Sequence, residues 1–143
     1  MNHSKRLEVF EILEKVASQK TRQDKIKVLR ENNIMPLRDV LQGTFDPAIK
    51  FKLPVGTPPF TENEINTAPS SLLRHHRFFK YFVEGVQECE RLSTVKREKM
   101  FIDTLEAIHP EDAKIVISMV AKKTPVKGLT KKLVQEALPD LIR

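Results

Sequence analysis

The sequence predicts an all-α fold, a single compact helical domain of about six or seven helices with a long proline-rich strap. Apolar residues recur at spacings of three and four, and the alternating, β-branched runs typical of strands do not occur. The length of 143 residues is that of one ordinary domain. A hydrophobic fraction of 40% with 31% charged residues is typical of a chain that folds, so we expect neither global disorder nor collagen-like repeats.

Three helices are expected in the first third of the chain. The first covers residues 4–18, with Ser4 as its N-cap and an apolar stripe on one face. The second is capped by Thr21 and ends near Glu31. The third is short and is expected to end at Gly43, because glycine commonly terminates helices.

A proline-rich segment follows between Thr44 and Pro69. Five of the nine prolines lie in it, which excludes a continuous helix. Apolar residues punctuate the segment, so we expect an extended strap packed onto the helices instead of a free linker. The expected anchors are Phe45, Ile49, Phe51, Leu53 and Phe60.

The helical pattern resumes after Ser71 and predicts one long central helix that ends near Glu90. Thr94 is expected to cap the next helix, and His109, followed by proline and two acids, marks the start of another. After a lysine-rich connector, Thr130 is expected to cap the last helix.

The motifs of catalysis and metal binding are missing from the sequence. The chain contains neither G-x-x-x-x-G-K-S/T nor G-x-G-x-x-G, the two glycine-rich motifs that bind nucleotide phosphates. Its single cysteine, Cys89, excludes intrachain disulfides and multi-cysteine metal sites. His75 and His76 are adjacent, so on a helix they point about 100° apart; we interpret them as a partly exposed polar edge. Solvation and the helix dipole account for Glu111 and Asp112. We therefore expect no enzyme, no cofactor and no metal.

Positive charge gathers in three clusters, within a formal net charge of +6. The first spans Ala113 to Gln135, which holds six lysines and no acid. In it, Gly128 permits a close backbone approach to an anion, and the helix start after Thr130 attracts phosphate. The second cluster is Arg74, Arg77 and Lys80 beside the two histidines, and the third is Lys20, Arg22, Lys25 and Lys27.

These clusters predict contact with the phosphates of duplex DNA, provided that the fold brings two or three of them to one side. The alternative is a solvated lysine-rich surface without a binding partner. The candidate DNA-binding residues are Lys122, Lys123, Lys127, Gly128, Thr130, Lys131, Lys132, Lys20, Arg22, Lys25, Arg74 and Arg77.

Three segments, in order, resemble the N-terminal DNA-binding domain of the ATP-dependent DNA ligases of T-even-type bacteriophages. They are VFEILEKVASQKTRQDKIKVLRENN (Val9 to Asn33), TFDPAIKFKLP (Thr44 to Pro54) and AKIVISMVAKKTPVKGLTKKLVQEALPDLI (Ala113 to Ile142). The most specific parts are Gly128-Leu129-Thr130 and Pro139-Asp140-Leu141-Ile142. The strap lacks the family's tyrosine, and residues 55–66 have no counterpart.

The ligase active-site motif Lys-x-Asp-Gly is absent from the chain. The resemblance therefore implies a helical module that contacts the minor groove and backbone of duplex DNA, with the closing turn around Lys127, Gly128, Thr130 and Lys131 near phosphate, and without nick sealing. It also implies a stand-alone protein of a tailed phage.

We expect a non-catalytic, sequence-independent duplex-DNA-binding accessory protein of phage replication or repair, in the cytoplasm of the host cell. The alternative is a protein-interaction module that docks on phage or host replication or transcription machinery through residues 57–66 of the strap. A small hydrolase or transferase is the third reading. No run approaches the ~18 apolar residues that cross a bilayer, so no membrane partner is expected.

Overall fold

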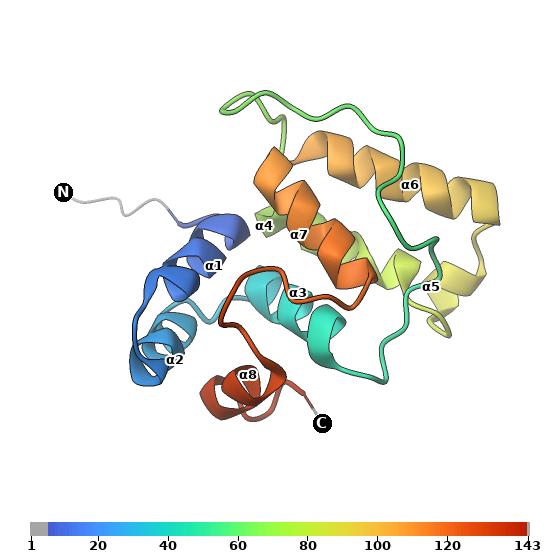
Figure 1. Cartoon of the computed structure of the whole chain (residues 1–143). Helices are drawn as coiled ribbons and strands as arrows, with labels where there is room; N and C mark the ends of the chain where they lie inside the picture. Colours follow the sequence, from blue (N-terminus) through green and yellow to red (C-terminus); the bar gives the residue numbers. More distant parts are fainter. Residues whose placement is uncertain (1–5, 143) are drawn as a thin grey trace.

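The computed structural model describes residues 6–142, and in that range the chain is all-α, as predicted (Figure 1). The described residues form eight α-helices and one 3₁₀ helix. In chain order these are α1 (Val9–Ser18), α2 (Arg22–Glu31), α3 (Met35–Phe45), α4 (Leu72–His75), η1 (His76–Phe82), α5 (Gln87–Glu90), α6 (Thr94–Ala107), α7 (Pro110–Val120) and α8 (Lys131–Ala137).

The first two helices begin at polar caps. Helix α1 starts at Val9, later than predicted, and its N-cap is Glu8, whose backbone N–H donates to the Glu11 carboxylate at 2.8 Å. The predicted cap Ser4 lies outside the described residues. Helix α2 confirms its predicted cap, because the Thr21 hydroxyl accepts from the backbone N–H of Asp24 at 3.1 Å.

Helix α3 continues through Gly43 to Phe45, so the prediction that this glycine ends the helix is wrong. Gly43 is buried against α7, and a Cβ atom built on it would lie 2.7 Å from Sδ of Met119 and 3.0 Å from Cζ of Phe51. The glycine thus lets two packed elements approach α3 closely.

The strap has no helix between residues 46 and 71, and it packs on the core as expected. Three of the expected anchors in this segment, Phe51, Leu53 and Phe60, pack against the core, as does Phe45 at the end of α3. The expected anchor Ile49 is not among the residues packed there. Asn63 fixes the far end, because its amide donates at 2.8 Å to the carbonyls of both Glu106 and Ile108 at the end of α6.

The predicted central helix is broken into α4, η1 and α5. The strap competes for its backbone: the N–H of Lys52 donates to the carbonyl of Phe82, and the N–H of Glu84 donates to the carbonyl of Lys50, both at 2.7 Å. Gly85 then takes a φ of +89°, which ends regular structure before α5.

Helix α6 is capped by Ser93, one residue before the predicted Thr94, since the Ser93 hydroxyl accepts from the N–H of Lys96 at 3.2 Å. Helix α7 begins as predicted: Nδ1 of His109 accepts from the N–H of Glu111 at 3.0 Å. The imidazole also stacks on Phe10, with ring centroids 4.2 Å apart.

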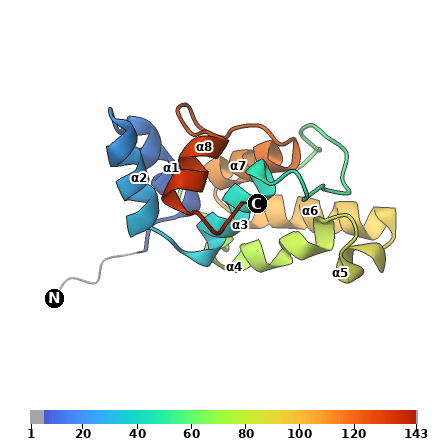
Figure 2. The same ribbon diagram turned by 90° about the horizontal axis from the view of Figure 1, so that it is seen from below.

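One continuous set of buried apolar residues joins the helices, and α8 completes it by packing against α2 (Figure 2). The hydroxyl of Thr130 accepts from the N–H of Leu133 at 3.1 Å, which confirms the predicted cap. In the part of the chain that the structure describes, no helix combines the length and the apolar character needed to cross a membrane.

Candidate nucleic-acid interface

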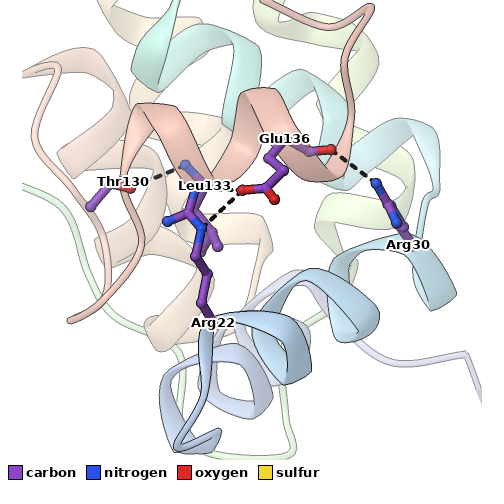
Figure 3. Close-up of polar contacts among 5 residues, drawn as sticks. All are labelled: Arg22, Arg30, Thr130, Leu133 and Glu136. Atoms are coloured by element: carbon purple, nitrogen blue, oxygen red, sulfur yellow. Dashed lines mark hydrogen bonds and ion pairs between the residues drawn. The ribbon is translucent and has the colours of Figure 1, made fainter.

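Two arginines fasten α8 to α2. Figure 3 shows the two helices running in the same direction, with Arg22 and Arg30 of α2 reaching toward α8. Arg22 donates to one carboxylate oxygen of Glu136 at 2.9 Å from Nε and 2.6 Å from Nη2. Arg30 donates to the backbone carbonyls of Ala137, at 3.1 Å, and Glu136, at 3.0 Å, which otherwise lack helical partners.

The start of α2 also meets the turn that leads into α8. Gly128 in this turn has a φ of +83°, and a Cβ atom on it would lie 3.0 Å from Cε of Lys25. The glycine that the sequence suggested for approach to an anion thus admits the Lys25 side chain. The contact brings the third basic cluster beside the second half of the first cluster.

We call this surface the α2–α8 basic face. Its members come from residues 19–25 and 127–136, where the acids are Asp24 and Glu136. They are Lys20, Arg22, Lys25, Lys127, Gly128, Thr130, Lys131 and Lys132.

Four lysines of the face are exposed, and their ammonium groups have no hydrogen-bond or ion-pair partner within residues 6–142: Lys20, Lys127, Lys131 and Lys132. Two other cations are drawn inward. The ammonium of Lys25 donates to the carbonyl of Gln19, and Arg22 pairs with Glu136. The face therefore keeps a surplus of unneutralised positive charge, which suits an anionic partner.

The sequence predicts that Lys122 contacts DNA, but the structure engages its ammonium within the protein. Although much of the residue is exposed, its ammonium donates to the carbonyls of Gly43 at 2.5 Å and of Asp46 and Ile49 at 2.8 Å. Desolvation lowers the pKa of Lys122, against the opposing effect of Asp46. The three available donors are used within the protein, so Lys122 joins the ends of α7 and α3.

The backbone at Lys122 explains this role. Its φ of +58° places it in the left-handed region, its N–H donates to the carbonyl of Met119, and the N–H of Lys123 donates to the carbonyl of Ser118. This is the Schellman arrangement that ends α7, with lysine where glycine is usual.

The connector, residues 121–130, separates the first cluster in space. Figure 1 shows it crossing from the end of α7 toward α1 and α2 before it enters α8. Lys123 is exposed at the α7 end, whereas Lys127 lies next to Gly128 at the α2 end. Lys123 is therefore not part of the α2–α8 basic face.

The second cluster also lies elsewhere. Arg74 and Arg77 are exposed on α4 and η1, which pack with α3 and not against α2 or α8 (Figure 2). Lys80 lies 3.5 Å from the carboxylate of Glu88. The fold thus unites parts of the first and third clusters and leaves the second cluster apart.

The adjacent histidines face different surroundings. Nδ1 of His76 lies 2.6 Å from Oδ2 of Asp39, a residue of α3. Nδ1 of His75 is buried without a partner among the described residues, and burial lowers the pKa of His75. Both residues are partly exposed, as predicted. No sequence signal linked Asp39 to a histidine 37 residues away.

Asp112 is fully buried, so the prediction that solvation accounts for this carboxyl group is wrong. Its Oδ1 accepts from the N–H of Phe10 at 2.9 Å, while Oδ2 has no partner within the described range. Desolvation, together with the nearby Glu8, Glu11 and Glu111, raises its pKa to about 7 despite that hydrogen bond. Across residues 6–142, no group of three or more metal-ligating side chains is placed to hold an ion.

Comparison with curated proteins and with solved structures finds no match. One family model, described as a family of unknown function (DUF6433), matches residues 12–125. The matched region runs from α1 into the connector and includes the strap, η1 and α7. Because the family model matches most of the length of the chain, the chain belongs to the DUF6433 family.

Proposed function

We propose that this protein binds duplex DNA through the α2–α8 basic face, contacting phosphates without reading the bases and without catalysing a reaction. The observation that carries the proposal is the joining of Lys20 to Lys127, Lys131 and Lys132 across the contact between Lys25 and Gly128. Lysines that lack acidic partners bind phosphates as point charges, and such contacts carry no sequence information.

The resemblance to phage ligase DNA-binding domains supports the same assignment. It extends the proposal to an accessory protein of phage replication or repair that works in the cytoplasm of the host cell. The resemblance implies that the turn at Lys127 to Lys131 lies near phosphate, and this turn is part of the α2–α8 basic face.

The test is fluorescence anisotropy with a short intact duplex at about 50 mM salt. We expect saturable binding whose affinity falls with a log-log salt slope of about −3.6 if the four free lysines each contact one phosphate. The triple variant Lys127→Glu, Lys131→Glu, Lys132→Glu is expected to bind at least about tenfold more weakly, and its slope to be shallower by about one per lost contact.

The matched control is Lys50→Glu, Arg91→Glu, Lys96→Glu, which changes the net charge equally on the strap, beside α5 and on α6. These three residues are exposed and make no ion pair within the described chain. Equal weakening by both triple variants, or no binding at low salt, would overturn the proposal.

A second candidate function, docking on a protein, is favoured by an apolar surface between the strap and α6. Val55, which lines this surface, has a relative exposure of 73%, and Val95, near the start of α6, has one of 79%. A hollow of about 220 Å³ lies between the strap and α6, lined in part by Pro58, Phe101 and Ile102. Exposed apolar side chains around a hollow are a common feature of protein-binding surfaces.

A further inference from the structure

A second hollow, of about 280 Å³, lies between α3, the strap and η1. It is distinct from the α2–α8 basic face and adjoins the basic cluster that this face does not include. Its volume is close to the lower end of the range for small-molecule sites, about 300 Å³.

The 3₁₀ geometry of η1 builds one wall of this hollow. With three residues per turn, side chains at i and i+3 align, so His76 and Phe79 form an inner row while Arg77 and Lys80 form an outer row. Phe79 is only 6% exposed, whereas both members of the outer row are exposed. The wall is therefore aromatic at its base and cationic at its mouth.

The strap adds a second aromatic ring. Phe51 lines the hollow and lies against Gly43, whose missing Cβ makes room for Cζ of the ring. Gln42, next to Gly43 on α3, lines the same hollow and offers both a donor and an acceptor. Two rings and one amide are a combination that suits a flat heteroaromatic body.

The charge in and around the hollow is positive. The acid in its lining, Asp39, is held by His76 at 2.6 Å. Arg77 has no acidic partner within residues 6–142, and the ammonium of Lys122 lies 5.8 Å from the centroid of the Phe51 ring. The ammonium of Lys80 lies 3.5 Å from a carboxylate oxygen of Glu88, which neutralises part of its charge. The surplus favours an anionic group at the mouth, next to Arg77.

We propose that this hollow binds a nucleoside monophosphate. The nucleobase lies against Phe51 and Phe79, the amide of Gln42 hydrogen-bonds to the edge of the nucleobase, and the phosphate pairs with Arg77. A free nucleotide and the phosphorylated end of a nucleic-acid strand share this chemistry. The inference does not depend on duplex binding by the α2–α8 basic face, which uses other residues.

The test is isothermal titration of the full chain with adenosine monophosphate, adenosine and a 5′-phosphorylated trinucleotide at about 150 mM salt. We expect saturable binding of adenosine monophosphate and at least about tenfold weaker binding of adenosine, because charge-assisted hydrogen bonds to the phosphate are lost. Tighter binding of the trinucleotide than of the mononucleotide, with the difference lost in Arg77→Glu, would assign the site to a strand end, and the reverse order to a free nucleotide.

Arg77→Glu is expected to weaken mononucleotide binding by at least about tenfold, with Gln42→Leu weakening it less. The matched control is Arg74→Glu, an equal charge change on an exposed residue that does not line the hollow. Each variant's thermal midpoint is measured, and Arg77→Glu should fold normally because the side chain is exposed. Absence of saturable mononucleotide binding, or equal weakening by Arg74→Glu and Arg77→Glu, would overturn the inference.

Discussion

Asp112 holds a carboxyl group between α7 and the start of α1, where its side chain is out of contact with solvent. Burial near three other carboxylates favours the protonated form, which is why its pKa rises to about 7. The folded protein therefore binds a proton more tightly here than the unfolded chain does.

This difference gives a prediction for stability against pH. A carboxyl group with a raised folded-state pKa contributes most below its unfolded value of about 4, and the contribution is lost as the pH rises through about 7. Asp112→Asn keeps an acceptor for the N–H of Phe10 without the buried charge. We expect the variant to exceed the wild type in unfolding free energy at pH 8 by up to about 4 kcal/mol, at about 1.4 kcal/mol per pKa unit.

Urea denaturation at pH 5 and pH 8 measures the effect. The gain should shrink toward pH 5, where the wild-type carboxyl group is already protonated. Asp112→Ala is the companion variant, expected to be less stable than Asp112→Asn at both pH values because it leaves the Phe10 N–H unpaired. An Asp112→Asn variant that loses stability equally at both pH values would contradict the prediction.

Local sequence signals correctly predict three of the helix caps but predict poorly how a long side chain is used. Thr21, His109 and Thr130 cap their helices as expected, because each bond spans only two or three residues. Lys122 reaches carbonyls 73 to 79 residues away in sequence. A lysine-rich run does not reveal which of its ammonium groups will turn inward.

At the scale of elements, Gly43 governs how closely α3 approaches α7 and the strap. Glycine normally weakens a helix interior by about 1 kcal/mol relative to alanine, so helix propensity alone favours Gly43→Ala. The packing opposes this change, because the added Cβ would meet Met119 at 2.7 Å and Phe51 at 3.0 Å.

We predict that Gly43→Ala lowers the unfolding free energy by about 1–3 kcal/mol, since overpacking the contact with the fully buried Met119 outweighs the gain in helix propensity. Chemical denaturation measures the change. In the double variant Gly43→Ala, Met119→Ala, the smaller side chain at position 119 leaves room for the added Cβ. The double variant should therefore lose less unfolding free energy than the two single variants lose together. A stabilising Gly43→Ala would show that Met119 and Phe51 adjust freely.

The break of the expected central helix has a long-range cause. Phe82 and Glu84 exchange backbone hydrogen bonds with Lys50 and Lys52 of the strap, about thirty residues earlier in the chain. An apolar pattern at spacings of three and four fits both one long helix and the observed α4–η1–α5 path. The pattern therefore predicts the buried face and not the backbone path.

For the whole molecule, the sequence predicts an all-α fold with a packed strap, and both are confirmed. It also identifies every lysine of the α2–α8 basic face. Which clusters meet depends on the pairing of α2 with α8 and on where the connector crosses, and neither is encoded in a local pattern. The separation of Arg74 and Arg77 from α8 follows from the same tertiary packing.

The two candidate functions use separate surfaces, which allows a direct comparison. Val55→Ser with Val95→Ser is expected to leave duplex affinity within about twofold of wild type and the unfolding free energy within about 0.5 kcal/mol, because both side chains are largely exposed. Anisotropy and thermal unfolding provide these measurements. A phage or host replication or transcription protein bound by the wild type and the lysine triple variant, but not by the valine variant, would favour docking.

The arginine contacts to α8 bear on where the chain can be cut. The family match stops at residue 125, yet Leu133, Val134 and Leu138 beyond it are buried, and Arg22 and Arg30 reach across to α8. A fragment cut at the end of the matched region would expose the apolar surface of α2 that α8 covers, and it would leave the guanidinium groups of Arg22 and Arg30 without their partners. The self-sufficient unit for expression or domain grafting must therefore keep the chain through Ile142.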